Sequence, residues 1–441
     1  MRSRHSRDCF LLILAILCSA AFARCGEEEH PPFDVDRFLN GPDHSDFAWK
    51  FATYGPHFTM QQRYILGVYA TIEGSRLSHT PADELHFVLK VANAKNQWIA
   101  ERYTRVKIPH KADASEDVNY FCSLYLRPGR YTVALVVYDA VLKQENIRRK
   151  RLNVSLLNKD PLPQLDRNLP EIEFTSESPR DYASRFPNVT NHMDDLVTLS
   201  SMENFANTES SHRLDWTLAE GKEWLPVNNS SSLSIDIVAN ISSDYDHNRN
   251  LFLRSNYHTR RVKSSDIVRI ASVLSHLGLR KGCIRVTIVD TLRMETFFDR
   301  EDAADFDWPR AGELISKQDS ATIEASSLGS QDQAPAYLLE KFNGIFEKDG
   351  CNSVRESSPK IVIVVSRDIE FLAAHTRIER VLPQNPASAR FFYFQVTDSI
   401  YGEDDLLKML KPAKPRQFLV PDSYAFRKSL AALITSLEKL K

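Results

Sequence analysis

The sequence lacks the short motifs by which many enzyme active sites are recognised. It contains no HExxH, Gly-x-Ser-x-Gly, Walker or Gly-x-Gly-x-x-Gly motif, and no Cys-x-x-Cys pair of the kind that binds zinc. Glycine is scarce, at 14 of 441 residues, so few flexible loops could cradle a phosphate. These absences predict a protein without catalytic activity. An extracytoplasmic enzyme, such as a hydrolase with no recognisable motif, stays open as an alternative.

A strong charge of either sign is also missing. The 56 basic side chains are balanced by 58 acidic ones, which leaves a formal net charge of −2. Nothing in this balance indicates electrostatic capture of nucleic acid. Long hydrophobic runs are absent after the first part of the chain, so we expect no membrane-spanning segment in the mature protein.

One apolar run lies near the start of the chain, at residues 9–23, and follows several arginines. It is too short to span a bilayer, and Ala21 and Ala23 supply the small residues that a signal peptidase requires. We therefore predict that residues 1–23 are a secretory signal peptide and that the protein is periplasmic or extracellular. Two alternatives are an uncleaved anchor and a lipid anchor on Cys25, the second disfavoured by the charged Arg24 before it.

Export would expose the chain to disulfide formation and, in a eukaryote, to glycosylation. The cysteines that follow the predicted cleavage site are Cys25, Cys122, Cys283 and Cys351. They could pair in three ways. Cys283 and Cys351 each precede a predicted strand of one domain, which makes them the preferred pair. The asparagines that fit the glycosylation sequon are Asn153, Asn188, Asn228, Asn229 and Asn240.

The pattern of apolar residues divides the mature chain into parts. Residues 24–61 have little periodicity and are interpreted as a lead-in. Residues 62–157 alternate apolar and polar side chains, are rich in Val, Tyr and Ile, and contain no helical stretch, which predicts an antiparallel β-sandwich. Residues 158–231 are rich in proline and polar groups and are interpreted as a linker with partial structure.

Strands and helices alternate in the last part, residues 232–441. Residues 264–279 place apolar side chains on one face of a helix, and residues 360–366 are continuously apolar, as in a central parallel strand. This alternation predicts an α/β domain with a doubly wound, mostly parallel sheet and helices on both faces.

This last part resembles the von Willebrand factor type A domain. "LSIDIVANIS" is followed by an amphipathic helix, a second strand, a short antiparallel third strand and two helices. "KIVIVVSRD" then begins three further strand–helix units. The whole chain looks like the bacterial secreted proteins that carry a divergent form of this domain behind a β-rich domain.

The resemblance implies a metal site in the crevice at the carboxyl edge of the sheet. The family ends its first strand in Asp-x-Ser-x-Ser, and neighbouring loops add a threonine and a second aspartate. These oxygens hold a magnesium ion and leave a position for a ligand's carboxylate. The residues aligned with these motifs are Asp236, Val238, Asn240, Ser366, Arg367 and Asp368. Val238 offers no oxygen, and Arg367 brings a positive charge to the place of the cation, so the resemblance implies a degenerate metal site.

A shift of register could restore oxygen ligands. The substitutes would be Asn240, Ser242, Asp244 and Asp368, with Asp290 from the end of the second strand as a further candidate. The protein would then be a metal-dependent type A receptor that binds Mg²⁺ or Ca²⁺, which stays an alternative.

The preferred interpretation is a secreted, non-catalytic binding or adhesion protein with a degenerate metal-ion-dependent adhesion site. We expect no cofactor, and we expect an unidentified protein ligand to contact the crevice above the sheet. The candidate crevice residues are Asp236, Asn240, Ser242, Asp244, Ser366, Arg367 and Asp368.

Overall fold

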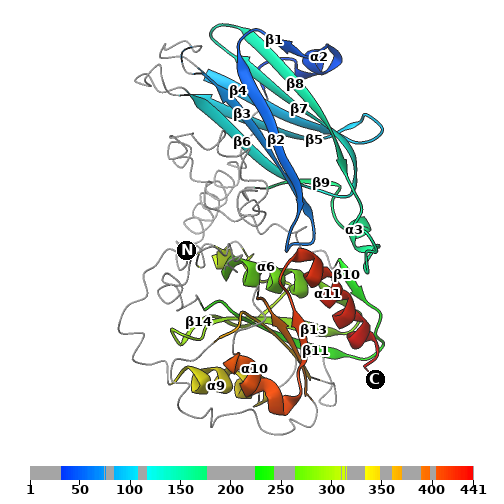
Figure 1. Cartoon of the computed structure of the whole chain (residues 1–441), viewed down its shortest axis with the longest axis vertical. Coiled ribbons are helices and arrows are strands. Elements are labelled where there is room, and N and C mark those ends of the chain that lie inside the picture. The colour runs from blue at the N-terminus through cyan, green and yellow to red at the C-terminus, as the bar shows by residue number, and fades with distance from the viewer. Residues whose placement is uncertain are drawn as a thin grey trace, which may run out of the picture. The chain divides into compact units, whose positions relative to one another are not determined.

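The computed structural model describes most of the chain after the predicted signal peptide. The described residues are 31–73, 75, 84–107, 117–175, 224–242, 264–308, 310–312, 314, 333–347, 360–369, 389–397 and 404–440. The chain forms two compact units, and Figure 1 labels their elements. The first unit comprises residues 1–49, 71–118 and 131–152, and the second comprises 50–70, 119–130 and 153–441.

An antiparallel sheet of five strands in the order β1-β8-β7-β4-β5 forms the first unit. The strands are β1 (His44–Ser45), β4 (Glu84–Ala92), β5 (Trp98–Lys107), β7 (Gly129–Asp139) and β8 (Gln144–Val154). Helix α2 (Val35–Asn40) lies against this sheet, and its apolar side chains pack with Val88, Val136 and Ile147. Residues 85–89 of β4 and 133–137 of β7 are consecutively buried, so both faces of these central strands are covered.

A four-stranded sheet in the order β2-β3-β6-β9 belongs to the second unit. Its strands are β2 (Trp49–Phe58), β3 (Tyr64–Ile72), β6 (Val118–Leu126) and β9 (Ile172–Thr175). The range interpreted as a lead-in thus supplies β2, and the range interpreted as a linker supplies β9. Gly55 and Pro56 interrupt the strand pattern of β2, and its position at the edge of the sheet explains how a proline is accommodated there.

A mixed, mostly parallel sheet follows, with the order β14-β13-β11-β15-β16-β17. Its strands are β11 (Leu233–Asn240), β13 (Gly282–Asp290), β14 (Glu295–Asp302), β15 (Lys360–Ser366), β16 (Ala389–Gln395) and β17 (Arg416–Leu419). Only the pairing of β13 with β14 is antiparallel. The predicted fold class is confirmed, because sandwich-like antiparallel sheets precede an α/β sheet.

Helices cover both faces of this mixed sheet (Figure 1). They are α6 (Ser264–Ser275), α9 (Ala334–Glu347), α10 (Asp405–Leu410), the short 3₁₀ helix η5 (Lys411–Ala413) and α11 (Ser423–Glu438). Ile235 and Ile237 of β11 pack with the side chains of α6 and α11, whereas Val238 packs with those of α9 and α10. All of β11 is buried, as expected for the central strand. From β11 the chain adds β13 and β14 on one side of the sheet and β15, β16 and β17 on the other. The switch point therefore lies between β11 and β15, where such folds leave a crevice at the carboxyl ends of the strands.

The segment between the sheets is tied to the α/β part by a buried ion pair. The guanidinium of Arg427, on α11, donates to both carboxylate oxygens of Asp160 at 2.9 and 2.6 Å. Helix α3 (Leu165–Asn168) follows, and β10 (Leu225–Val227) pairs in parallel with β12 (Leu277–Leu279). The range interpreted as a linker is therefore ordered over its described residues.

Two further predictions meet the structure only in part. Cys283 is disulfide-bonded and Cys122 is a buried thiol. Cys25 and Cys351 lie outside the described residues, so the pairing of Cys283 with Cys351 stays a prediction. Over the residues that the structure describes, we find no helix with the length and apolarity needed to cross a membrane.

Gly282 allows β13 to begin close beside β11. Its φ is +127°, and a Cβ at this position would lie 1.9 Å from the carbonyl oxygen of Leu233. We expect Gly282→Ala to lower the free energy of unfolding by about 3 kcal/mol, measured by urea denaturation. Gly344→Ala is the matched control, because no heavy atom lies within 4 Å and replacing a helical glycine should raise stability by about 1 kcal/mol. Wild-type stability of Gly282→Ala would contradict the close approach of the two strands.

Candidate functional site

Polar side chains gather where the central strands of the mixed sheet end. Asn240 is the last residue of β11, Asp290 the last of β13 and Ser366 the last of β15. The strand register places Asn240 beside Ser366 on one side and beside Val289 on the other. All of these polar residues are buried. The cluster lies at the switch point of the sheet, where ligands bind in many doubly wound folds.

The side-chain amide of Asn240 connects the ends of all three strands. Its Nδ2 donates to Ser366 Oγ at 3.0 Å. Its Oδ1 accepts from Ser242 Oγ at 2.7 Å, from Thr291 Oγ1 at 2.9 Å and from Thr291 N at 3.1 Å. The backbone N–H of Ser242 is a fourth donor, at 3.4 Å. A carbonyl oxygen has two lone pairs, so four donors leave it no capacity for another partner.

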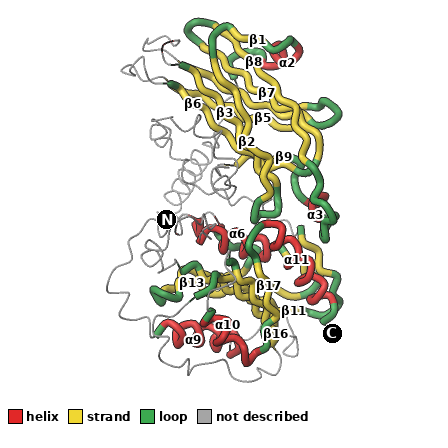
Figure 2. Tube along the Cα trace, viewed as in Figure 1, coloured by secondary structure: helices red, strands yellow, loops and turns green. Residues whose placement is uncertain are grey.

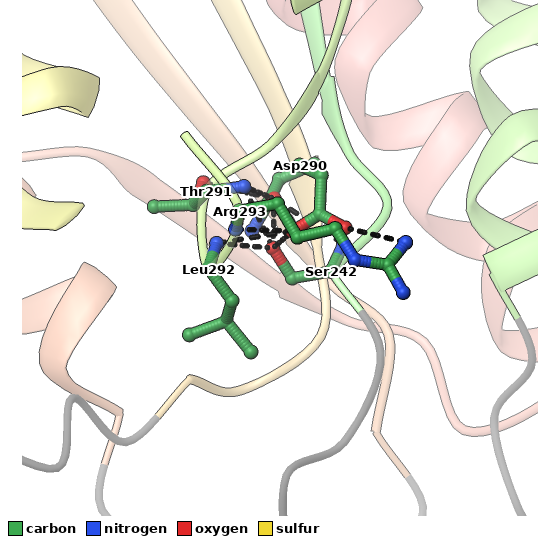
Figure 3. Close-up of polar contacts among 6 residues, drawn as sticks. Ser242, Asp290, Thr291, Leu292 and Arg293 are labelled. Carbon is green, nitrogen blue, oxygen red and sulfur yellow. Dashed lines mark hydrogen bonds and ion pairs between the residues drawn. The ribbon is translucent and has the colours of Figure 1, made fainter. Parts of the chain in front are cut away.

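Ser242 and Asp290 form the second half of the cluster (Figure 3). Ser242 Oγ lies 3.0 Å from Asp290 Oδ1 and accepts from the backbone N–H groups of Thr291 and Leu292 at 2.8 and 3.2 Å. Asp290 Oδ1 also accepts from Leu292 N at 3.0 Å and Arg293 N at 3.1 Å, and its Oδ2 lies 3.7 Å from an Arg293 guanidinium nitrogen. The turn after β13 therefore folds over the carboxylate.

These contacts occupy the oxygens that a metal ion would need. A hard cation such as Mg²⁺ requires several oxygen ligands with open lone pairs. Here Asn240 Oδ1 and Asp290 Oδ1 are filled by hydroxyl and backbone donors, and Arg293 adds a positive charge. Among the described residues, no group of three or more His, Cys, Asp or Glu side chains could hold a metal. The cluster as it stands does not fit an oxygen-ligated cation.

The segment after β15 is fixed by hydrogen bonds to its backbone. Ser366 Oγ donates to the carbonyl of Arg367 at 2.8 Å, and Tyr393 Oη contacts the same carbonyl at 3.3 Å. Tyr393 Oη donates to Asp404 Oδ2 at 2.7 Å, and Asp404 also caps the first turn of α10. Burial raises the pKa of Asp404 to about 6, although the hydrogen bond from Tyr393 opposes this rise. Arg367 itself is buried, and Asp368 is half-buried.

Asp236 does not belong to this cluster. It lies in the middle of β11, where the Arg300 Nε donates to its Oδ1 at 3.1 Å and the Arg285 Nε lies 3.3 Å from the same oxygen. Burial raises the pKa of Asp236, and the two arginines oppose this rise. Because β11 continues to Asn240, the register that starts the metal motif at Asn240 fits the fold better than the one that starts at Asp236.

Other candidate residues are only partly accounted for. Asp244 lies outside the described residues. Thr291 was missed by the sequence reasoning, although it directly follows the buried strand β13 and so was recognisable as an edge residue. Of the described sequon asparagines, Asn153 and Asn228 are exposed, whereas Asn229 and Asn240 are buried and use their amide Nδ2 in hydrogen bonds. Asn188 is not among the described residues.

Comparisons with known proteins give no family for the chain. No protein-family model matches the sequence, and no curated protein matches it. Among solved structures, a Northeast Structural Genomics Consortium target has 14% identity, covers 27% of this chain and 94% of its own, and has a TM-score of 0.18. A beta-glucuronidase of Bacteroides uniformis has 8% identity, covers 85% of this chain and 39% of its own, and has a TM-score of 0.19.

A glycosyl hydrolase family 2 member from Bacteroides cellulosilyticus is similar to the same extent, with 8% identity, a TM-score of 0.18, and coverage of 84% of this chain and 42% of its own. The chain thus spans about two fifths of the length of either Bacteroides enzyme. Likenesses with scores this low carry no argument about the fold or the activity of this chain.

The bonds of Asn240 predict a graded loss of stability. We expect Asn240→Ala to lower the free energy of unfolding by about 3 kcal/mol, because it leaves buried donors of Ser242 and Thr291 without their acceptor. Ser366→Ala removes a single acceptor of this amide and should cost about 1 kcal/mol. Chemical denaturation of both variants measures the difference. Equal losses would show that Asn240 does not join the strand ends as described.

The buried Asp404 predicts a pH dependence of stability. Its folded pKa of about 6 exceeds that of an unfolded aspartate, about 4, so the folded state binds the proton more tightly. The stabilisation is complete below about pH 4 and is lost as the pH rises through about 6. Asp404→Asn keeps a capping oxygen but removes the titration, so its stability relative to wild type should rise by about 2 kcal/mol between about pH 4 and pH 7.

Denaturation at several pH values provides the measurement. Asp422→Asn changes the exposed N-cap of α11 and is the matched control, since it should leave the pH dependence of the wild type in place. A constant difference between Asp404→Asn and wild type across the pH range would contradict the assignment.

Proposed function

We propose that the α/β part is a divergent, non-catalytic relative of the von Willebrand factor type A domain. It binds a protein through the carboxyl edge of its sheet and does so without a metal ion. The strand order β14-β13-β11-β15-β16-β17, with β14 antiparallel, supports this proposal because it matches the order of elements on which the resemblance rests. The predicted export signal supports a site of action outside the cytoplasm.

The observation that carries the proposal is the filled coordination of Asn240 Oδ1. In the family, a cation would connect the loops at this edge. In this chain the Asn240 amide connects the ends of β11 and β15 with the turn after β13 through hydrogen bonds. A site held rigid in this way loses little conformational entropy when a partner binds.

The charges at this edge favour an acidic group on the partner. The Arg293 guanidinium is about one-fifth exposed, and the nitrogen–oxygen distance of its ion pair to Asp290 is long, at 3.7 Å. A guanidinium can bind a carboxylate through two parallel hydrogen bonds. An acidic side chain of the partner would thereby be received by protein cations in place of a metal ion.

Catalysis is not supported by the groups in the cluster. The hydroxyl oxygen of Ser242 is buried and accepts from the backbone N–H groups of Thr291 and Leu292, so its lone pairs are occupied. A serine nucleophile needs a free lone pair to attack a substrate. We therefore prefer recognition to hydrolysis as the function.

A metal-binding experiment tests the proposal. Wild-type protein should bind no Mg²⁺, Ca²⁺ or Mn²⁺ in isothermal titration calorimetry, because its edge oxygens are filled. Asn240→Asp should gain affinity, since it places a second carboxylate beside Asp290 and removes the amide donor. Stoichiometric metal binding by wild type, lost in Asn240→Ala, would replace this proposal with a metal-dependent receptor.

Capture of the partner provides the second arm of this test. Wild-type protein, Arg293→Glu and Arg310→Glu are each used as bait in the fraction that surrounds the producing cells. The partner should be recovered with wild type and with Arg310→Glu, whose exposed side chain lies over Phe298, and should be lost with Arg293→Glu. Equal recovery with all three baits would place the binding surface elsewhere.

A further inference from the structure

The amino edge of the mixed sheet contains a second, chemically different feature. A pocket of about 410 Å³ lies at the start of β16 and β17 and beside the end of α11, elements that are labelled in Figure 2. Four cationic side chains line it: Arg390, Lys414, Arg416 and Lys439. No carboxylate is among the residues that line the pocket. This edge is opposite to the one that carries Asn240.

These cations are not neutralised by the part of the chain that the structure describes. None of the four forms an ion pair there. Glu438, the acidic residue next to Lys439, accepts instead from the backbone N–H of Asn228 at 3.0 Å. Arg416 hydrogen-bonds to Ser436 and lies over the ring of Phe418 at 5.2 Å, which holds its guanidinium in place.

All four cationic side chains are exposed, and they do not come from a single element. The end of α11 has a negative dipole that favours Lys439, but Arg390, Lys414 and Arg416 come from other elements. Lys414 is held in a left-handed conformation, with φ of +50°, and its N–H donates to the carbonyl of Lys411. Like charges repel one another, and a concave site lined by one sign concentrates the electrostatic potential. An anionic ligand would relieve this repulsion.

We propose that this pocket binds an organic ligand that bears a phosphate or sulfate group. Arginine guanidinium groups match tetrahedral oxyanions with paired hydrogen bonds, and the lysines add charge. Among the lining residues, Phe392 and Leu440 belong to the apolar core on the α11 side of the sheet, and they supply apolar contacts for the organic part. The volume falls within the range of small-molecule sites and exceeds what an inorganic ion needs. The proposal is independent of the function proposed for the carboxyl edge.

Calorimetry with simple probes tests this inference on the full mature chain. Naphthyl phosphate and naphthyl sulfate should bind saturably and more weakly as salt is added, whereas neutral naphthol should not bind. Inorganic phosphate should bind about tenfold more weakly than naphthyl phosphate, since it lacks the apolar contact. Comparable binding of inorganic phosphate would overturn the organic-ligand part of the proposal.

Variants locate the binding. The double variant Arg390→Gln, Lys439→Gln should weaken binding of naphthyl phosphate by at least about tenfold. Arg390→Lys, which keeps the charge and loses the planar fork, should weaken it less. Lys411→Gln is the matched control, because this exposed lysine lies near Lys414 in the chain but not in the pocket lining, and it should leave affinity unchanged. Thermal melting confirms that each variant is folded.

Two results would overturn the proposal. One is the absence of saturable binding of either ester to wild-type protein at low salt. The other is equal affinity of the double variant and Lys411→Gln, which would assign any binding to general surface charge.

Discussion

The hydrogen bonds of a single amide oxygen hold the carboxyl edge of the mixed sheet together. Asn240 Oδ1 receives the hydroxyls of Ser242 and Thr291 and the backbone N–H of Thr291, while Nδ2 of the same amide reaches Ser366. All of these groups are buried, so each one needs its partner to offset the loss of water. The end of β11 and the turn after β13 are therefore coupled, and neither can move without breaking bonds in the other.

Much of the architecture could be predicted from the sequence, and so could Asn240, Ser242 and Ser366 as residues at the strand ends, but the place of Asp236 could not. Continuous apolar runs and amphipathic helices predicted the parallel sheet, because burial on both faces leaves a clear pattern. Strand β2 was missed since Gly55 and Pro56 break its alternation. The metal motif was aligned with Asp236, in the middle of β11, for a different reason. A buried carboxylate such as Asp236 suggests a strand end unless its cationic partners are known, and Arg285 and Arg300 lie far away in the sequence.

The two edges of the mixed sheet differ in whether their charged side chains have partners of opposite charge. At the carboxyl edge, the Asp290 carboxylate accepts from backbone N–H groups and pairs with Arg293, so its charge is compensated within the protein. At the amino edge, cations such as Arg390 and Lys414 share a pocket that contains no acid. A satisfied cluster gives a rigid surface, whereas an unsatisfied one gives affinity for a ligand of opposite charge. The same sheet can thus offer a shaped contact at one edge and a charged pocket at the other.

The proposed loss of metal binding depends on more than one substitution. An aspartate in place of Asn240 would lack the N–H group that donates to Ser366 Oγ. It would also place a second negative charge near Asp290, since residues 240 and 290 both contact Ser242. Two buried carboxylates this close cannot both ionise without a cation between them. An amide removes the charge and supplies the missing donor in one side chain. The amide of Asn240 therefore depends on its partners Ser366 and Thr291, and they depend on it. A metal ion would require an acidic side chain at this position, and the chain has a neutral amide there.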